Sequence, residues 1–158
     1  MRGPGSIWER IGDISKYAVP AYALGLTIRE DTWEGTMQFA QVYGATLLAT
    51  EGMKHFIDAP RPNSMDNKSF PSGHTSEAFS GATFIHARYG LRQAAVPYLL
   101  ATITAYSRVD SEFHYVHDVV AGAALAGLFA FMFTDRYKLP FTVSADTQGA
   151  MVNFSAKF

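Results

Sequence analysis

The sequence predicts an all-α protein, a single bundle of five or six helices that ends in a short irregular or extended C-terminal tail. Three observations support this fold class. Apolar residues recur at helical spacing, three charge-free segments of about 16 residues are long enough for several helical turns, and clustered Pro, Gly and Asn residues separate the segments. The 48% hydrophobic and 14% aromatic content is enough for a full core and argues against disorder.

The chain length of 158 residues fits one domain. We expect residues 1–6 (Met-Arg-Gly-Pro-Gly-Ser) to be the remnant of an expression tag, so this end says nothing about a native signal peptide or anchor. Residues 7–140 then form the helical core, and residues 141–158 form the tail.

Two helical segments are expected to open the core. Residues 7–17 are amphipathic, with Trp8, Ile11 and Ile14 at helical spacing. Residues 19–28 form an apolar segment in which Pro20 suits the first turn of a helix. A charged turn follows at 29–34. A long helix over 36–56 is then expected to turn four apolar side chains inward: Phe39, Val42, Leu47 and Met53.

The segment 57–71 is predicted to be a loop, because it contains too many residues that interrupt helices and strands. These residues are Pro60, Pro62, Asn63, Asn67 and Pro71. Long loops in compact domains are usually functional, so this loop is a candidate part of a site.

Three further helices are expected after the loop. The first covers 72–89 and ends at Gly90, the second covers 91–107, and the third covers 114–137. The third is the most apolar, and Pro140 stops it. The tail alternates weakly between apolar and polar residues, which favours a hairpin.

The most informative stretch is residues 107–118, which reads Ser-Arg-Val-Asp-Ser-Glu-Phe-His-Tyr-Val-His-Asp. His114 and Asp118 are four apart, so on a helical turn they share a face and can touch. A carboxylate against one ring nitrogen fixes the tautomer and leaves the other nitrogen as a nucleophile or base. Arg108, just upstream, offers a planar set of donors that suits a phosphate or similar oxyanion.

Two other groups of residues have matching chemistry. Lys54 precedes the pair Arg61-Pro62 by seven positions, so a lysine closes one helix and an arginine enters the loop. Ser72-Gly73-His74 follows Pro71 and opens the next helix, where backbone N–H groups and the helix dipole favour an anion. His74 in this position can protonate a leaving oxygen.

Together the three patterns, K-x6-RP, PSGH and SR-x5-H-x3-D, resemble the type-2 phosphatidic acid phosphatase family. That family shares its fold and site with bacterial class A acid phosphatases and vanadium haloperoxidases. The resemblance implies that His114 attacks phosphorus and forms a phosphohistidine, that Asp118 orients His114, and that His74 protonates the departing alkoxide and then activates water. It also implies a set of groups that bind the phosphoryl oxygens: Lys54, Arg61, Ser72, Gly73 and Arg108.

The sequence departs from the family pattern at Glu112, where members often have glycine two residues before the nucleophilic histidine. With Asp110, Glu112 adds negative charge near the site and leaves the substrate class open. No set of His, Asp and Glu residues has metal-ligand spacing beyond chance. The resemblance implies no cofactor, and vanadate is expected to bind as an analogue of phosphate or of the transition state.

The residues themselves indicate an oxyanion site among apolar helices, and the resemblance implies a metal-independent phosphomonoesterase for lipid or isoprenoid phosphates in the extracytoplasmic cell envelope, in the periplasm. The alternatives are a soluble acid phosphatase for small organic phosphates, a vanadate-dependent haloperoxidase, and a non-catalytic bundle that binds an anion. The net charge of −1 indicates no nucleic-acid partner. The charge-free runs are shorter than the ~20 residues of a spanning helix, which favours a soluble protein and leaves peripheral membrane contact open. The sequence does not specify the oligomeric state.

Overall fold

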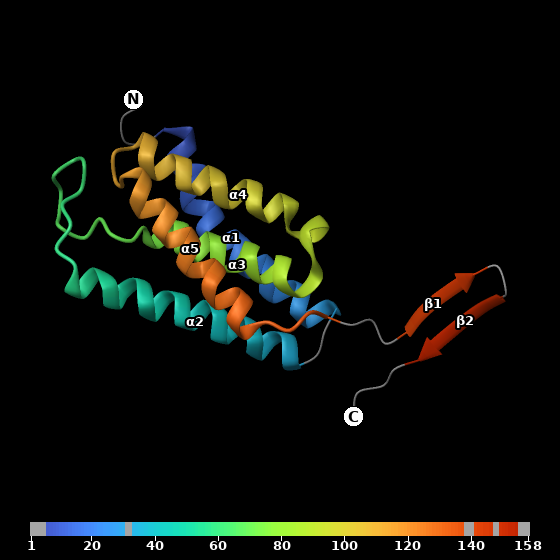
Figure 1. Cartoon of the computed structure of the whole chain (residues 1–158). Helices are drawn as coiled ribbons and strands as arrows, with labels where there is room; N and C mark the ends of the chain where they lie inside the picture. Colours follow the sequence, from blue (N-terminus) through green and yellow to red (C-terminus); the bar gives the residue numbers. More distant parts are fainter. Residues whose placement is uncertain (1–5, 31–32, 138–140, 147–148, 155–158) are drawn as a thin grey trace.

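The computed structural model describes residues 6–30, 33–137, 141–146 and 149–154. Its helices form the predicted all-α bundle (Figure 1). They are α1 (Ile7–Glu30), α2 (Trp33–Phe56), α3 (Gly73–Tyr89), α4 (Leu91–Asp110) and α5 (Val116–Phe133). In the tail, β1 (Phe141–Asp146) pairs antiparallel with β2 (Gly149–Phe154), as a hairpin would. Residues 147–148 and 155–158 of the tail lie outside the described residues, as does the predicted helix stop at Pro140 in the segment 138–140.

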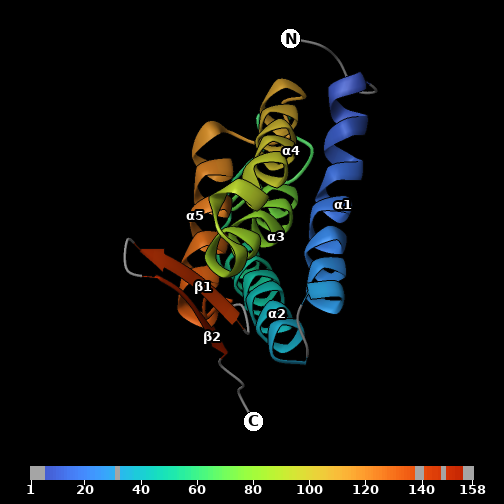
Figure 2. The same cartoon turned by 90° about the vertical axis from the view of Figure 1, so that its right-hand side faces the viewer.

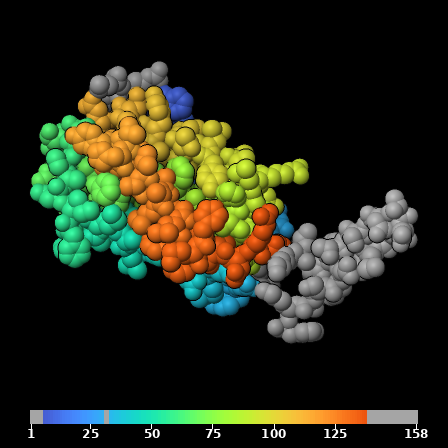
Figure 3. Space-filling view, viewed as in Figure 1, coloured from blue at the N-terminus to red at the C-terminus, as the bar shows by residue number. Residues whose placement is uncertain are grey.

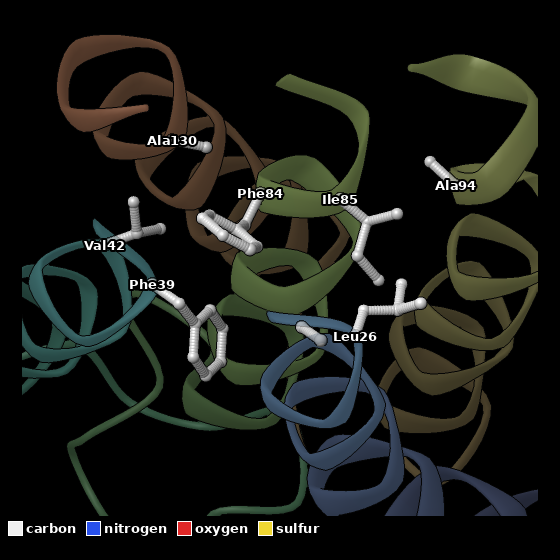
Figure 4. Packing of buried hydrophobic residues seen from close by; sticks show 8 residues of the cluster. Leu26, Phe39, Val42, Phe84, Ile85, Ala94 and Ala130 are labelled. Atoms are coloured by element: carbon white, nitrogen blue, oxygen red, sulfur yellow. The ribbon is translucent and has the colours of Figure 1, made fainter. Parts of the chain in front are cut away.

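Helix α3 is the centre of the bundle and packs against each of the other four helices (Figure 2). Phe84 and Ile85 of α3 are fully buried and meet Leu26 of α1 with Phe39 and Val42 of α2 (Figure 4). Burying one such side chain stabilises the fold by about 1.5–3 kcal/mol. This cluster therefore fixes α1 and α2 on α3 near the end of α3, whereas Gly73 and His74 of the predicted site lie at its start.

The first two predicted segments form one continuous helix, so the predicted break before Pro20 is wrong. Pro20 lies inside α1 and is buried. A proline inside a helix costs about 3 kcal/mol, but the backbone of Val19 and Pro20 packs directly on Gly81 of α3. A side-chain carbon at Gly81 would lie 2.9 Å from the carbonyl oxygen of Val19. Tertiary packing at this crossing therefore outweighs the local preference for a break.

Helix α5 begins at Val116 rather than at the predicted position 114. The Tyr115 N–H donates to the Asp118 carboxylate, 2.8 Å away, and this contact closes the N-terminus of the helix. His114 therefore lies in the segment before α5. This difference changes the expected relation between His114 and Asp118.

Much of the outer surface of α5 is apolar and exposed, and it crosses the face shown in Figure 3. Among the described residues, α5 is the one helix that is long and apolar enough to cross a membrane, and 28% of its residues are buried. Its exposed large side chains include Val116, Val120, Leu128, Phe131 and Met132. A contiguous apolar face of this kind marks a surface that meets a partner or a membrane.

The segments that carry the sequence motifs meet at one end of the bundle. At this end α2 and α4 finish, α3 and α5 begin, and the loop over 57–72 connects α2 to α3 (Figure 1). The first turns of α1 lie at the same end. The chain therefore brings the ends of five helices and the loop between α2 and α3 to one place.

Candidate active site

A cavity of about 430 Å³ opens at this end of the bundle. Six of the residues singled out in the sequence line it: Lys54, Arg61, Gly73, His74, Arg108 and His114. The other lining residues are Lys16, Glu51, Met65, Asp66, Glu77 and Phe113. Ser72 and Asp118, also singled out in the sequence, are fully buried and are not among the lining residues.

His114 is held by the backbone of the loop. Its Nδ1 lies 2.7 Å from the carbonyl oxygen of Ser69, so Nδ1 carries the proton and donates it to this acceptor. Nε2 is then unprotonated and lies 3.3 Å from Nη1 of Arg61. The side chain is 3% exposed. This arrangement presents a neutral imidazole nitrogen to the cavity, which is the form that can act as a nucleophile.

Asp118 does not hydrogen-bond to His114 as the spacing suggested. The closest approach, from Asp118 Oδ2 to His114 Nδ1, is 3.6 Å. The reason is that His114 precedes α5, so the two residues do not lie on consecutive turns of one helix. Asp118 Oδ2 instead accepts hydrogen bonds from the Ser69 hydroxyl and the Tyr115 N–H. Asp118 therefore fixes Ser69, and the Ser69 carbonyl orients His114.

The loop over 57–72 holds two of the cations, Arg61 from the loop itself and Lys54 from the end of α2. Arg61 donates from Nε to Asp66 Oδ1 at 2.6 Å and from Nη1 to the carbonyl oxygen of Phe113 at 3.1 Å. Lys54, at the end of α2, donates to the carbonyl oxygen of Lys68 at 2.9 Å. Asp66 also accepts from the Lys68 N–H, so one carboxylate organises both the loop and the guanidinium.

The third cation, Arg108, comes from the end of α4, and its side chain is 4% exposed. Its Nε donates to the Ser107 hydroxyl and its Nη2 to the carbonyl oxygen of Glu9 in α1, each at 3.1 Å. Nη1 lies 3.1 Å from Asp13 Oδ1. The same Asp13 oxygen lies 3.1 Å from Nε2 of His74. Asp13 therefore joins the predicted acid to one of the predicted phosphate-binding groups.

Burial and positive charge shift the proton equilibria of both histidines. Burial first, and then Arg61 and Lys54, lower the pKa of His114 to about 4. Burial first, and then Arg108 and Lys16, lower the pKa of His74 to about 4, while Asp13 opposes the shift. Burial and the neighbouring Arg61 also lower the pKa of Lys54. Four basic side chains, Lys16, Lys54, Arg61 and Arg108, line the cavity, and a bound oxyanion would offset their charge.

Ser72 and Glu112 take different places from those the sequence suggested. The Ser72 hydroxyl pairs with the Thr75 hydroxyl at 3.0 Å, and the Ser72 N–H donates to the Asp118 carbonyl at 3.0 Å, so Ser72 stabilises the junction of α3 and α5. Glu112 has φ 57° and is exposed outside the cavity. This left-handed conformation suits glycine, which gives a conformational reason for glycine at this position.

Sequence reasoning missed three residues that contact the predicted site side chains: Asp13, Asp66 and Ser69. Asp13 sits in a helix that precedes every motif, and Ser69 acts through its backbone carbonyl, so neither has a local signal. Asp66 is one of several polar residues in the loop, and only its contact with Arg61 distinguishes it. In the described part of the chain, no group of three or more His, Cys, Asp or Glu side chains is placed to hold a metal ion.

Comparison with known proteins agrees with this site. The PAP2 superfamily model matches residues 35–139. A lipid A 4'-phosphatase of Helicobacter pylori is 31% identical over 143 residues, which cover 84% of this chain and 72% of that protein. A lipid A 1-phosphatase of Porphyromonas gingivalis is 32% identical over 134 residues, 78% of this chain but 30% of that longer protein.

Two crystal structures have a similar fold. LpxE of Aquifex aeolicus aligns with a TM-score of 0.68 at 21% identity, covering 79% of this chain and 81% of that one. A transmembrane PAP2-type phosphatidylglycerolphosphate phosphatase of Bacillus subtilis aligns with a TM-score of 0.63 at 23% identity, covering 80% and 73%. With three motifs assembled around one cavity and a family model matched over most of the chain, this protein belongs to the PAP2 superfamily.

Proposed function

We propose that this protein hydrolyses lipid phosphate monoesters through a phosphohistidine intermediate, without a metal, at a membrane surface of the extracytoplasmic cell envelope. Its family and its two lipid A phosphatase relatives make it a phosphoric monoester hydrolase. The observation that carries the mechanism is the placement of His114 and His74 on one cavity together with three cations. The relatives' substrates and the exposed apolar face of α5 support a lipid substrate.

In the first step, the neutral Nε2 of His114 attacks phosphorus and the bond from phosphorus to the ester oxygen breaks. The protonated His74 gives its proton to this leaving oxygen, so the alcohol departs neutral. Burial and the neighbouring Arg108 and Lys16 lower the pKa of His74, and the negative charge of a bound phosphate raises it. Phosphate binding therefore favours the protonated form that this step needs.

In the second step, His74 takes a proton from water, and the resulting hydroxide attacks the phosphohistidine. The bond from phosphorus to Nε2 breaks, which releases inorganic phosphate and restores neutral His114. Throughout both steps Lys54, Arg61 and Arg108 face the phosphoryl oxygens together with the N–H groups at the start of α3. Preorganised positive groups stabilise the charge that the transition state places on these oxygens.

The test compares an alkyl phosphate with a nitrophenyl phosphate in wild-type protein and in two variants. His114→Ala is expected to abolish turnover of both esters, because no phosphoenzyme can form. His74→Ala is expected to slow the alkyl ester by about 10²–10⁴-fold and the nitrophenyl ester far less, because nitrophenolate leaves without a proton. Equal losses for His74→Ala, with a large residual rate for His114→Ala, would reverse the two roles.

Two additions separate the rival functions. A chelator is expected to leave turnover unchanged, and vanadate is expected to inhibit it by imitating the transition state. A vanadate-loaded protein that oxidised bromide with peroxide and cleaved no phosphate ester would be a haloperoxidase. Faster turnover of small soluble esters than of detergent-solubilised lipid phosphates would favour the soluble acid phosphatase.

A further inference from the structure

Asp13 connects helix α1 to the reacting end of the molecule. One oxygen of its carboxylate lies 3.1 Å from His74 Nε2 and 3.1 Å from Arg108 Nη1. His74 comes from α3 and Arg108 from α4, so three helices meet at this oxygen. The carboxylate is 48% exposed, whereas the Arg108 side chain is 4% exposed. Asp13 thus lies at the border between the buried guanidinium and the open cavity.

Close packing of α1 on α4 fixes the position of Asp13. Gly12 faces Ser107 so closely that a side-chain carbon at position 12 would lie 2.1 Å from the Ser107 hydroxyl oxygen. The carbonyl oxygen of Glu9, one turn earlier, accepts from Arg108 Nη2. Two points of α1, Glu9 and Asp13, therefore hold the same guanidinium. The family model matches residues 35–139, so α1 lies outside the matched region.

On the basis of the proposed function, we infer that Asp13 is a positioning residue that holds the His74 ring and the Arg108 guanidinium for proton transfer to the leaving group. A carboxylate that accepts from Nε2–H fixes the tautomer of an imidazole and makes its other nitrogen more basic. Within the described structure Asp13 is the partner of the His74 ring, through Nε2. Nδ1 is therefore the nitrogen that exchanges a proton with the substrate.

The charges around His74 explain why a carboxylate is needed there. Asp13 and Lys16 face the ring from α1 and Arg108 faces it from α4, while Glu77 on its own helix and Glu51 and Lys54 on α2 line the same cavity. Lys16 and Arg108 both disfavour the imidazolium form, and Asp13 favours it. Without the Asp13 charge, protonated His74 would be rarer at the pH where His114 is a nucleophile.

The experiment uses Asp13→Asn in the full chain, with Glu30→Gln as the matched control. Glu30 is a carboxylate at the far end of the same helix, in an exposed pair with Arg29. We expect Asp13→Asn to slow the alkyl ester by about 10–100-fold, while the nitrophenyl rate stays within about threefold. In an NMR titration of the solubilised protein, His74 is expected to titrate at lower pH than in wild type. Glu30→Gln is expected to match wild type in both measurements.

Other results would overturn the inference. Equal losses with both esters, a lower melting temperature and an unchanged His74 titration would mean that Asp13 only anchors α1. Faster turnover with tighter vanadate inhibition would mean that Asp13 competes with phosphate for Arg108. Wild-type protein that cleaved neither ester would refute the proposed function, and the His74 titration would still decide whether Asp13 controls that histidine.

Discussion

The reactivity of His114 depends on groups that contact its two ring nitrogens from different segments. The carbonyl oxygen of Ser69 accepts a hydrogen bond from Nδ1, and Arg61 lies beside Nε2. Burial and the two nearby cations, Arg61 and Lys54, keep the ring neutral at physiological pH by lowering its pKa to about 4. In the proposed mechanism the neutral ring is the attacking form, so the cations that would bind an oxyanion would also keep His114 in its nucleophilic state.

A pH dependence of stability follows from this low pKa. The ordinary value of 6.5 applies to the unfolded chain, whereas the folded value is about 4. Between these values the unfolded state binds more protons, so the free energy of unfolding decreases as pH falls from 6.5 to 4. At pH 4.5 the loss due to His114 alone is on the order of 2 kcal/mol. Between pH 4.5 and 7.5, the melting temperature of His114→Asn is expected to change less with pH than that of wild type.

His55→Asn is the control for this measurement, because His55 is exposed on α2 outside the cavity. The melting temperature of His55→Asn is expected to change with pH as that of wild type does. If His114→Asn and wild type lost the same stability on acidification, the ring of His114 would not be held neutral by its surroundings.

The backbone at Glu112 leads to a second prediction for a single residue. Glu112 has φ 57°, a conformation in which a side chain is strained by about 1–2 kcal/mol and glycine is not. Replacing Glu112 by glycine relieves this strain, but part of the stabilisation is lost because glycine has more conformational freedom in the unfolded chain. Glu112→Gly is therefore expected to raise the free energy of unfolding by about 0.5–1 kcal/mol, as measured by chemical denaturation. Glu112→Ala removes the charge but keeps the strain, and a gain of the same size there would assign the effect to charge.

At the scale of elements, the crossing of α3 and α5 sets the distance between the motifs. Gly122 of α5 packs on the start of α3, where a side-chain carbon would lie 2.7 Å from the carbonyl oxygen of Ser72. The Ser72 N–H in turn donates to the carbonyl oxygen of Asp118. These contacts hold Gly73 and His74 against the segment that begins with His114, so the crossing is part of the site's geometry.

Gly122→Ala is expected to move α5 away from α3. The overlap with backbone atoms cannot be relieved by a flexible side chain, so the free energy of unfolding is expected to fall by about 1–3 kcal/mol. Turnover is expected to decrease by a larger factor than the fraction of folded protein does. Gly127→Ala on the same helix is the matched control, since a side-chain carbon there would meet the Thr83 methyl group at 3.9 Å, an ordinary contact. If Gly122→Ala were as stable and active as Gly127→Ala, the close crossing of α3 and α5 would not determine the geometry of the site.

At the scale of the whole molecule, the cationic cavity lies at one end of a bundle whose outer surface is partly apolar. The end carries Lys54, Arg61 and Arg108, and the exposed face of α5 runs away from it (Figures 1 and 3). A lipid phosphate likewise combines a charged part with an apolar part, the anionic head group and the hydrocarbon tail. In the function proposed above, the head group binds at the cationic end and the apolar side of the bundle contacts lipid.

Membrane association is expected to depend on the apolar face of α5. Leu128 and Phe131 are 55% and 62% exposed, so Leu128→Arg with Phe131→Arg leaves the core intact. An arginine in the hydrocarbon region costs about 2.5–3.5 kcal/mol, so the double variant is expected to bind vesicles more weakly. Vesicle flotation measures this, with circular dichroism as the check on folding. Gln93→Arg, an exposed position on α4, is expected to float like wild type. Equal flotation of the double variant and wild type would place the lipid contact elsewhere.

The fold class and most of the site could be predicted from the sequence because their signals are local. Helical spacing, the prolines of the loop and the fixed spacing inside each motif depend on residues near one another in the chain. These patterns identified six of the residues that line the cavity. The boundaries of α1 and α5 were less accurate. Gly81 packs against Pro20 inside α1, and the contact of Asp118 with the Tyr115 N–H starts α5 at Val116, two residues after His114.

Only the tertiary structure decided which groups hold the reacting side chains. The sequence predicted a contact between His114 and Asp118. In the folded chain His114 instead donates to the Ser69 carbonyl oxygen, and Asp118 accepts from the Ser69 hydroxyl. The fold also brings Asp13 from α1 to His74. Such contacts join segments that are far apart along the chain, and a backbone carbonyl can accept from any donor that packing brings near it. The identity of a residue therefore determined what chemistry was available, and the packing of the five helices determined which partner would control it.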